Sequence, residues 1–182
     1  MFFDDQNNTD HFQKEVYEAA YRIASSNNLE SVVDVGCGSA FKLLYYFNDE
    51  FKTTGIDIGS TYDYLIRKYP EKDWLNGEGL DYSNIFGEIV ICSDVIEHVL
   101  DPDVLLNNLK KIKGIRYLVL STPDRLLARG WYDFGPPQNI THIREWNGKE
   151  FSAYIQSMGF DILSHQVTNY PQTTQMVICQ IK

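Results

Sequence analysis

The sequence predicts an α/β fold with a mostly parallel sheet. Short apolar runs of strand length alternate with segments of helical periodicity, and a glycine-rich turn follows the first apolar run. We expect strands near residues 31–35, 52–57, 72–75, 88–92 and 115–121. We expect the connecting helices near residues 40–48, 60–69 and 102–112. Such alternation favours right-handed crossovers between parallel strands.

Both ends of the chain add elements to this core. Apolar residues between Phe12 and Ser25 recur at helical spacing, which predicts an amphipathic helix covering one face of the sheet. A last helix is expected near residues 148–157. It is followed by FDILSHQVTNY and TTQMVICQIK, two extended runs typical of a hairpin. We expect residues 1–182 to form a single domain.

The segment SVVDVGCGSAFK indicates a nucleotide-cofactor site. Its valines suit a strand buried on both faces, and Gly36 and Gly38 let the backbone approach a ligand closely. About twenty residues later, the run FKTTGIDIG contains Asp57, whose carboxylate could accept hydrogen bonds from both hydroxyls of a ribose. The alternative for the glycine pair alone is a tight turn that binds nothing.

The glycine spacing differs from the G-x-G-x-x-G of nicotinamide-binding proteins, because the run reads Gly-Cys-Gly-Ser-Ala-Phe. The pattern Asp34-x-Gly36-x-Gly38 resembles motif I of the class I S-adenosylmethionine-dependent methyltransferases, with Ala40 in place of a frequent third glycine. This resemblance covers nearly the whole chain. It implies a Rossmann-like three-layer sandwich whose seven-stranded sheet is mostly parallel and ends in an antiparallel strand.

The resemblance also implies which residues hold S-adenosylmethionine. The acid of motif I would hold the ammonium end directly or through water, the turn would pass the methionine part, and the acid after the second strand would bind ribose. The residues concerned are Asp34, Gly36, Cys37, Gly38, Asp57 and Ile58. In the loop DWLNGEGLDYSN, Asp81 is preferred to Glu78 as the partner of the adenine amino group, and either could be an ordinary solvated acid.

A second motif, IVICSDVIEHVLDP, joins a buried strand to polar residues at its carboxyl end, where open α/β sheets bind ligands. It resembles motif IV of the small-molecule branch, which implies that Ser93, Asp94 and Val95 lie along the cofactor. His98 is a candidate catalytic residue, and a buried structural hydrogen bond is its alternative. Asp101 is expected to cap the following helix.

Residues 122–148 contain prolines, glycines and aromatic residues that prevent a long regular element, which is typical of a lid or binding loop. The run STPDRLLARGWYDFGPPQNITHIREW resembles a subgroup linked to glycan or secondary-metabolite assembly. His142 is our first candidate for the base that O-methylation requires. Its alternative is a structural histidine that fixes the lid.

The lid also supplies candidate acceptor-binding residues. Arg125 and Arg144 could grip hydroxyls or a phosphate, or could pair with acids of the lid. Trp131, Tyr132 and Trp146 could stack on an acceptor ring, or could form an apolar underside of the lid.

Composition excludes several other classes. There are 16 Lys and Arg against 25 Asp and Glu, and the net charge of -9 argues against a nucleic-acid substrate. We expect no membrane span and no signal peptide, and therefore a cytoplasmic protein. The odd number of cysteines favours reduced thiols. Asp94, Glu97, His98 and His142 could gather around a divalent ion, but their spacing does not demand it, so no metal is predicted.

The resemblance favours an O-methyltransferase that acts on a sugar, a glycan precursor or another small molecule. One alternative is N- or C-methylation of a metabolite, which would leave His142 dispensable. The other is a non-catalytic cofactor-binding module that partners another enzyme, conceivably a glycosyltransferase.

Overall fold

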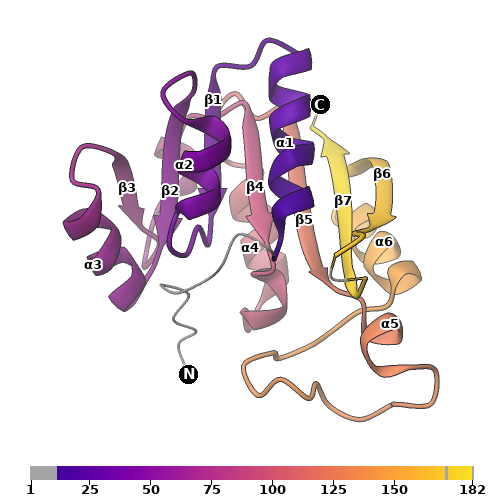
Figure 1. The fold of residues 1–182 in the computed structure, drawn as a ribbon. Coiled ribbons are helices and arrows are strands. Elements are labelled where there is room, and N and C mark those ends of the chain that lie inside the picture. The colour runs from indigo at the N-terminus through magenta and orange to yellow at the C-terminus, as the bar shows by residue number, and fades with distance from the viewer. Residues whose placement is uncertain (1–11, 171, 182) are drawn as a thin grey trace.

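The computed structural model describes residues 12–170 and 172–181, which form one seven-stranded sheet with helices on both faces (Figure 1). In chain order the strands are β1 Ser31–Val35, β2 Lys52–Asp57, β3 Asp73–Asn76, β4 Ile89–Ser93, β5 Tyr117–Pro123, β6 Asp161–Val167 and β7 Thr174–Gln180. The helices are α1 Lys14–Ser26, α2 Phe41–Phe47, α3 Gly59–Lys68, α4 Pro102–Leu109, α5 Arg125–Arg129 and α6 Gly148–Ser157. Two short 3₁₀ helices are η1 Tyr82–Asn84 and η2 Ile96–His98.

The strand order is β3-β2-β1-β4-β5-β7-β6. The first five strands are parallel, and β7 runs antiparallel between β5 and β6. The order reverses between β1 and β4, so the loops after these two strands diverge and open a crevice at their carboxyl ends. This arrangement confirms the predicted Rossmann-like sandwich with its antiparallel terminal strand.

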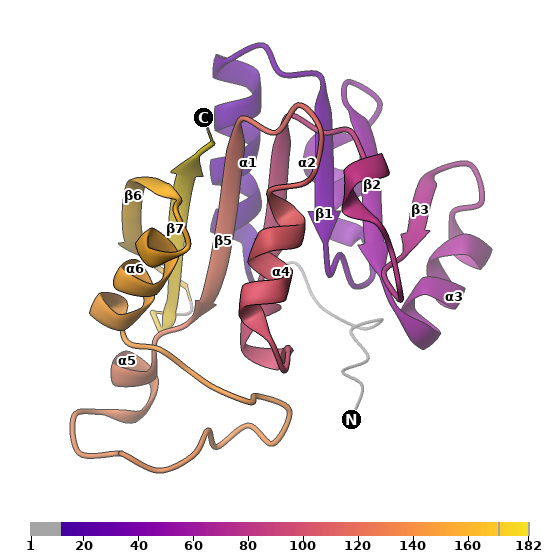
Figure 2. The ribbon, with the colours of Figure 1, turned by 180° about the vertical axis from the view of Figure 1, so that it is seen from behind.

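Two apolar cores fill the space between the sheet and its helices. On one face, α1, α2 and α3 pack through side chains that include Val16, Leu43 and Leu65. On the other face, α4 and α6 pack through side chains that include Leu106 and Phe151. Figures 1 and 2 show α1 and α2 on one side of the sheet and α4 and α6 on the other.

Capping residues fix several helix starts. Asp101 accepts a hydrogen bond from the backbone N–H of Val104 at 3.2 Å, as predicted for the start of α4. Asn147 and Glu150 form a reciprocal capping box at the start of α6. Asp124 caps α5, a five-residue helix inside the segment predicted to lack a long regular element.

None of the helices in the described part of the chain is long and apolar enough to cross a membrane. Cys37, Cys92 and Cys179 are buried free cysteines.

Candidate cofactor and acceptor site

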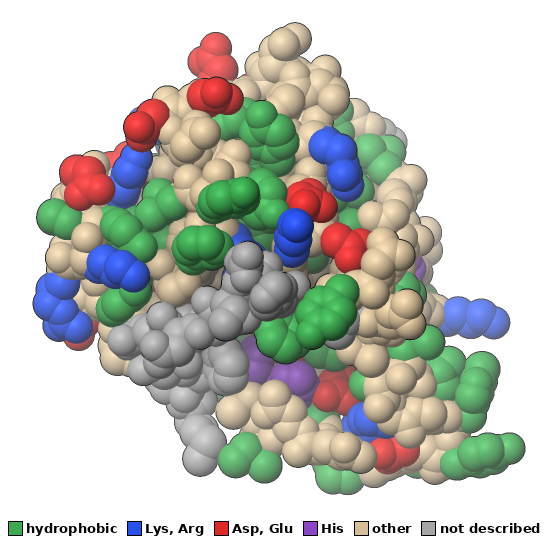
Figure 3. Space-filling model, viewed as in Figure 1, with side chains coloured by type: hydrophobic (Ala, Val, Ile, Leu, Met, Phe, Trp, Pro, Cys, Tyr) green, Lys and Arg blue, Asp and Glu red, His purple; other side chains and the backbone are tan. Residues whose placement is uncertain are grey.

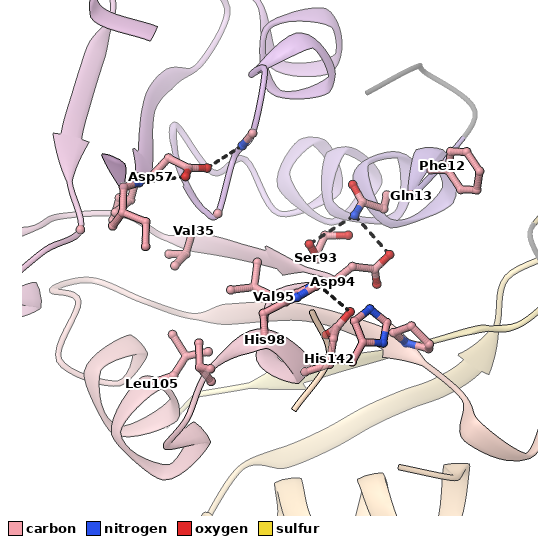
Figure 4. Close-up of a pocket in the computed structure, with 18 of the residues that line it drawn as sticks. Phe12, Gln13, Val35, Asp57, Ser93, Asp94, Val95, His98, Leu105 and His142 are labelled. Atoms are coloured by element: carbon pink, nitrogen blue, oxygen red, sulfur yellow. Dashed lines mark hydrogen bonds and ion pairs between the residues drawn. The ribbon is translucent and has the colours of Figure 1, made fainter. Parts of the chain in front are cut away.

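A cavity of about 730 Å³ opens at the carboxyl ends of β1, β2 and β4. Its volume lies within the range of small-molecule sites. The wall combines apolar side chains with a few acids and two histidines, drawn in Figure 4. The cavity therefore lies at the edge of the sheet where the sequence places both motifs.

The glycine turn forms one wall of this cavity. Gly36 and Gly38 have φ angles of 75° and 54°, in the left-handed region that glycine adopts without strain. The backbone N–H of Gly36 donates to the carbonyl of Ile56 at 2.8 Å, which fastens the turn to β2. A Cβ added at Gly36 would lie 2.3 Å from Cγ2 of Val95. A side chain here would therefore close the gap between the two cofactor motifs.

Asp57 connects the turn to the end of β2. Its carboxylate accepts hydrogen bonds from the backbone N–H groups of Gly38 and Ile58, both at 2.8 Å. Asp57 and Ile58 also line the cavity. Because each carboxylate oxygen has more than one acceptor site, Asp57 can hold the turn and still accept bonds from ribose hydroxyls.

Asp34 and Cys37 are buried and do not lie on the described cavity wall. Oδ2 of Asp34 accepts a hydrogen bond from the Tyr17 hydroxyl at 2.8 Å. Its Oδ1 has no hydrogen-bond partner among the described residues. Burial raises the pKa of Asp34 to about 7. The role of Asp34 at the cofactor ammonium, directly or through water, stays a prediction.

Neither acid considered for adenine lies on the described cavity wall. Asp81 is exposed, and its carboxylate caps η1 by accepting from the backbone N–H of Ser83 at 3.0 Å. Glu78 is also exposed. The wall in this region is formed by Gly77 and Tyr82 instead.

Ser93, Asp94 and Val95 line the cavity where β4 ends. Asp94 has a φ of 52°, and its carboxylate accepts from the Ser121 hydroxyl at 2.7 Å and from Nε2 of Gln13 at 3.2 Å. Burial raises the pKa of Asp94. Gln13 lies just before α1 and was not singled out from the sequence, because a polar residue at a helix start has many ordinary uses.

The structure brings His98 and His142 together on this wall, although 44 positions separate them in the sequence. Their rings meet edge to face with centroids 4.7 Å apart. Figure 4 shows both near Asp94 and on the opposite side of the cavity from Asp57. Burial lowers the pKa of His98. The two candidate catalytic residues therefore share one end of the site.

Glu97 completes this end of the cavity. Its side chain is 1% exposed, and one carboxylate oxygen accepts from the Thr122 hydroxyl at 2.9 Å. Burial and the neighbouring Asp94 raise the pKa of Glu97 well above its ordinary value. The backbone N–H of Ile143 donates to the carbonyl of Glu97 at 2.8 Å, which ties the lid to η2.

A chain of polar contacts orients His142. Its Nδ1 lies 2.7 Å from a carboxylate oxygen of Glu145, and Nη1 of Arg129 lies 3.1 Å from the other oxygen. Nε2 of His142 lies 3.0 Å from Nδ2 of Asn139. Glu145 was not selected from the sequence, although its spacing of three from His142 in HIRE was an available signal.

The five predicted acceptor-binding residues do not lie on the described cavity wall. Arg125 pairs with Glu150 at 2.8 Å, and Arg144 donates to the carbonyl of Leu100 at 2.7 Å. Trp146 stacks on Tyr154 in the core beside α6. The remaining two, Trp131 and Tyr132, are 76% and 94% exposed. Figure 3 shows hydrophobic side chains exposed along the edge where the lid runs.

The fold and this cavity define a Rossmann-like α/β protein with a nucleotide-cofactor site at the switch point of its sheet. The family model described as "Methyltransferase domain" matches residues 9–165, so the chain belongs to the methyltransferase domain family. One relative of this chain is described as a probable S-adenosylmethionine-dependent methyltransferase, and one structure of similar fold was solved with S-adenosylhomocysteine bound. The space between Gly36 and Val95, the carboxylate of Asp57 and the volume of the cavity fit S-adenosylmethionine.

Three similar proteins illustrate the relationship. A probable S-adenosylmethionine-dependent methyltransferase of Mycolicibacterium smegmatis is 26% identical over 152 residues, which cover 80% of this chain and 58% of the relative. Magnesium protoporphyrin IX methyltransferase from Synechocystis, solved with bound S-adenosylhomocysteine, matches with a TM-score of 0.67 at 17% identity, covering 93% of this chain and 83% of that one. The small RNA methyltransferase HEN1 matches with a TM-score of 0.72 at 17% identity, covering 100% of this chain and 27% of that one.

Proposed function

We propose that this domain transfers a methyl group from S-adenosylmethionine to a hydroxyl of a small molecule, with a sugar or glycan precursor as the acceptor class. The observation that carries the proposal is the pairing of His98 and His142 on the cavity wall opposite Asp57. If ribose binds at Asp57, the sulfonium end of the cofactor extends toward the histidines.

The chemistry at this end follows from the nucleophile. The bound cofactor supplies an electrophilic methyl group. A neutral hydroxyl attacks poorly unless it loses its proton, so the protein must activate it. Imidazole changes its charge near neutral pH, and the two rings are the groups on the described wall best suited to this task.

Glu145 supports this role for His142. The carboxylate of Glu145 accepts a hydrogen bond from Nδ1 of His142 at 2.7 Å. The ring proton is therefore on Nδ1, and the lone pair is on Nε2. Arg129 in turn holds Glu145 at 3.1 Å. These contacts hold the ring in one orientation, with Nε2 as the nitrogen that can accept a proton.

The choice of a small acceptor rests on charge. The net charge of -9 disfavours a polyanion, although one protein of similar fold is a small RNA methyltransferase. In this proposal the lid reads the part of the acceptor outside the cavity, since Trp131 and Tyr132 are exposed on the lid and do not lie on the wall.

Methyl transfer from labelled S-adenosylmethionine to nucleotide sugars, glycan fragments and phenols tests the proposal. His142→Ala should lower turnover on a hydroxyl acceptor about 10²- to 10⁴-fold, with little change in S-adenosylhomocysteine affinity. His165→Ala is the matched control, because His165 lies on β6 outside the cavity wall and contacts Ser152 on α6 and Gln175 on β7.

If only His98→Ala lost activity, the base would be His98. Normal turnover in both variants would contradict O-methylation and favour an N- or C-nucleophile. No transfer to any acceptor, with intact cofactor binding, would favour the non-catalytic module.

A further inference from the structure

The end of the cavity that holds the histidines has the donor set of a cation site. Glu97, His98 and His142 each present one ligand atom, and these atoms lie within 4.8 Å of one another. We propose that these three side chains bind a first-row divalent transition-metal ion. Binding of the ion stands on this geometry, whereas its use in methyl transfer rests on the proposed function.

The separation of the donors suits one shared ion. Nitrogen and oxygen ligands at about 2.1 Å from a tetrahedral ion stand about 3.4 Å apart. A cluster within 4.8 Å therefore needs only small side-chain rotations. Two imidazoles and one carboxylate favour ions such as Mn²⁺, Co²⁺ or Zn²⁺ over Mg²⁺, which prefers oxygen ligands. Three protein ligands also leave a coordination position for an oxygen of the acceptor.

The buried carboxylate of Glu97 is the second, independent observation. Its Oε2 accepts from Thr122, but its Oε1 has no hydrogen-bond partner among the described residues. Nε2 of His98 lies 3.9 Å from Oε1, too far for a hydrogen bond. An unpaired buried carboxylate oxygen is costly, and a cation between Glu97 and the rings would satisfy it.

In both histidines, Nδ1 contacts an oxygen atom, as the nitrogen that does not bind the metal does in metal-bound histidines. Nδ1 of His98 lies 3.0 Å from the carbonyl oxygen of Thr141, and Nδ1 of His142 lies 2.7 Å from Glu145. Since these oxygens only accept, both Nδ1 atoms carry the proton and both lone pairs are on Nε2. Metal-ligating histidines almost always donate their other N–H to a carbonyl or a carboxylate in this way.

The surrounding charges favour a cation. Asp94 accepts from Ser121 and Gln13 beside the cluster. The guanidinium of Arg129 is held by Asp133 and Glu145 on the outer side of His142. The amide of Asn139 lies 3.0 Å from Nε2 of His142, so the ion would take the place of that contact.

A divalent ion here would lower the pKa of an approaching hydroxyl, which is the activation that O-methylation needs. His142 would then act as a ligand and not as a base. Loss of turnover in His142→Ala fits both roles, so ion binding must be measured by itself.

The test is titration of the metal-free full chain with Co²⁺ alone, followed by visible absorption, and with Mn²⁺ or Mg²⁺ alone by calorimetry. We expect one Co²⁺ per chain. Glu97→Gln, His98→Gln and His142→Gln should each weaken Co²⁺ binding at least tenfold, and Glu145→Gln by about 10- to 100-fold. His165→Gln should bind Co²⁺ like the parent chain, and retained S-adenosylhomocysteine affinity would show that each variant is folded.

Absence of Co²⁺ and Mn²⁺ binding would overturn the proposal, as would equal Co²⁺ affinity in the parent chain and the ligand variants. Binding of Mg²⁺ without Co²⁺ or Mn²⁺ would overturn the assignment of a transition-metal ion. Ion binding without transfer to any hydroxyl would leave the metal site in place and contradict only the proposed function.

Discussion

Asp57 has two roles in the site: it holds the glycine turn through hydrogen bonds, and it lines the cavity. Replacement by Ala removes the acceptor of two backbone N–H groups and the expected partner of the ribose. We predict that Asp57→Ala weakens S-adenosylhomocysteine binding by roughly 1.5 to 3 kcal/mol, as measured by calorimetry. Asp63→Ala, on the exposed surface of α3, is the control and should bind normally. Unchanged affinity in Asp57→Ala would remove Asp57 from the site.

Asp34 gives the stability of the protein a specific pH dependence. Burial raises its pKa from 3.8 to about 7, and the hydrogen bond from Tyr17 offsets part of that rise. Between pH 4 and 7 the folded protein keeps a proton that the unfolded chain has released. The contribution of Asp34 to the free energy of unfolding therefore falls as pH rises through this window, and changes little above it.

Asp34→Asn should lack this loss because an amide does not titrate. We compare the unfolding free energy of the variant with that of the parent chain at each pH. This difference should shift in favour of the variant by roughly 2 to 3 kcal/mol between about pH 5 and about pH 7. Urea denaturation at the two pH values measures this difference. A difference that does not change with pH would show that Asp34 titrates normally in the folded state.

At the scale of elements, the side chain of Arg129 at the end of α5 anchors the first part of the lid. Arg129 is 4% exposed and donates to Asp133 through two nitrogens, at 3.0 and 2.6 Å. It also donates to the carbonyl of Gly135 and to Glu145. The hydrogen bonds from Arg129 and from the backbone N–H of Gly135 lower the pKa of Asp133 to about 2. Arg129 thus connects the start of the lid to the residue that orients His142.

Arg129→Lys should loosen the lid, because an ammonium cannot reproduce the forked contacts of a guanidinium. We predict faster proteolytic cleavage within residues 130–146 and a lower kcat/KM for the acceptor, with S-adenosylhomocysteine affinity unchanged. Arg116→Lys is the control, since Arg116 is half exposed and lies 3.9 Å from Glu88. Equal cleavage rates in the two variants would contradict the anchoring role.

Regular elements were predictable where apolar periodicity is strong. The strands expected near residues 31–35 and 52–57 have those bounds in the structure. The expected helix near residues 102–112 ends earlier, at Leu109. Helix α5 was not predicted because five residues carry no periodicity, and its start depends on the Asp124 cap. The exposure of the Trp131 side chain could not be predicted either, because a loop without apolar periodicity does not show which side chains face inward.

For the whole molecule, parallel topology explains why the site was partly predictable. Strands β1, β2 and β4 end at one edge, so Gly36, Asp57 and Asp94 had to meet there. The positions of Asp34 and Asp81 depend on packing and capping details that topology does not fix. The meeting of His142 with His98 depends on how the lid folds back, as its backbone contact with Glu97 shows.

The central claim is that the cofactor lies along this cavity with its ribose at Asp57 and its sulfur facing the two histidines. A crystal structure of the protein with S-adenosylhomocysteine tests it most directly. The account predicts ribose hydroxyls within hydrogen-bond distance of the Asp57 carboxylate and the sulfur on the side of Val95 that faces His98 and His142. A ligand with adenine at the histidine end, or with ribose away from Asp57, would contradict it.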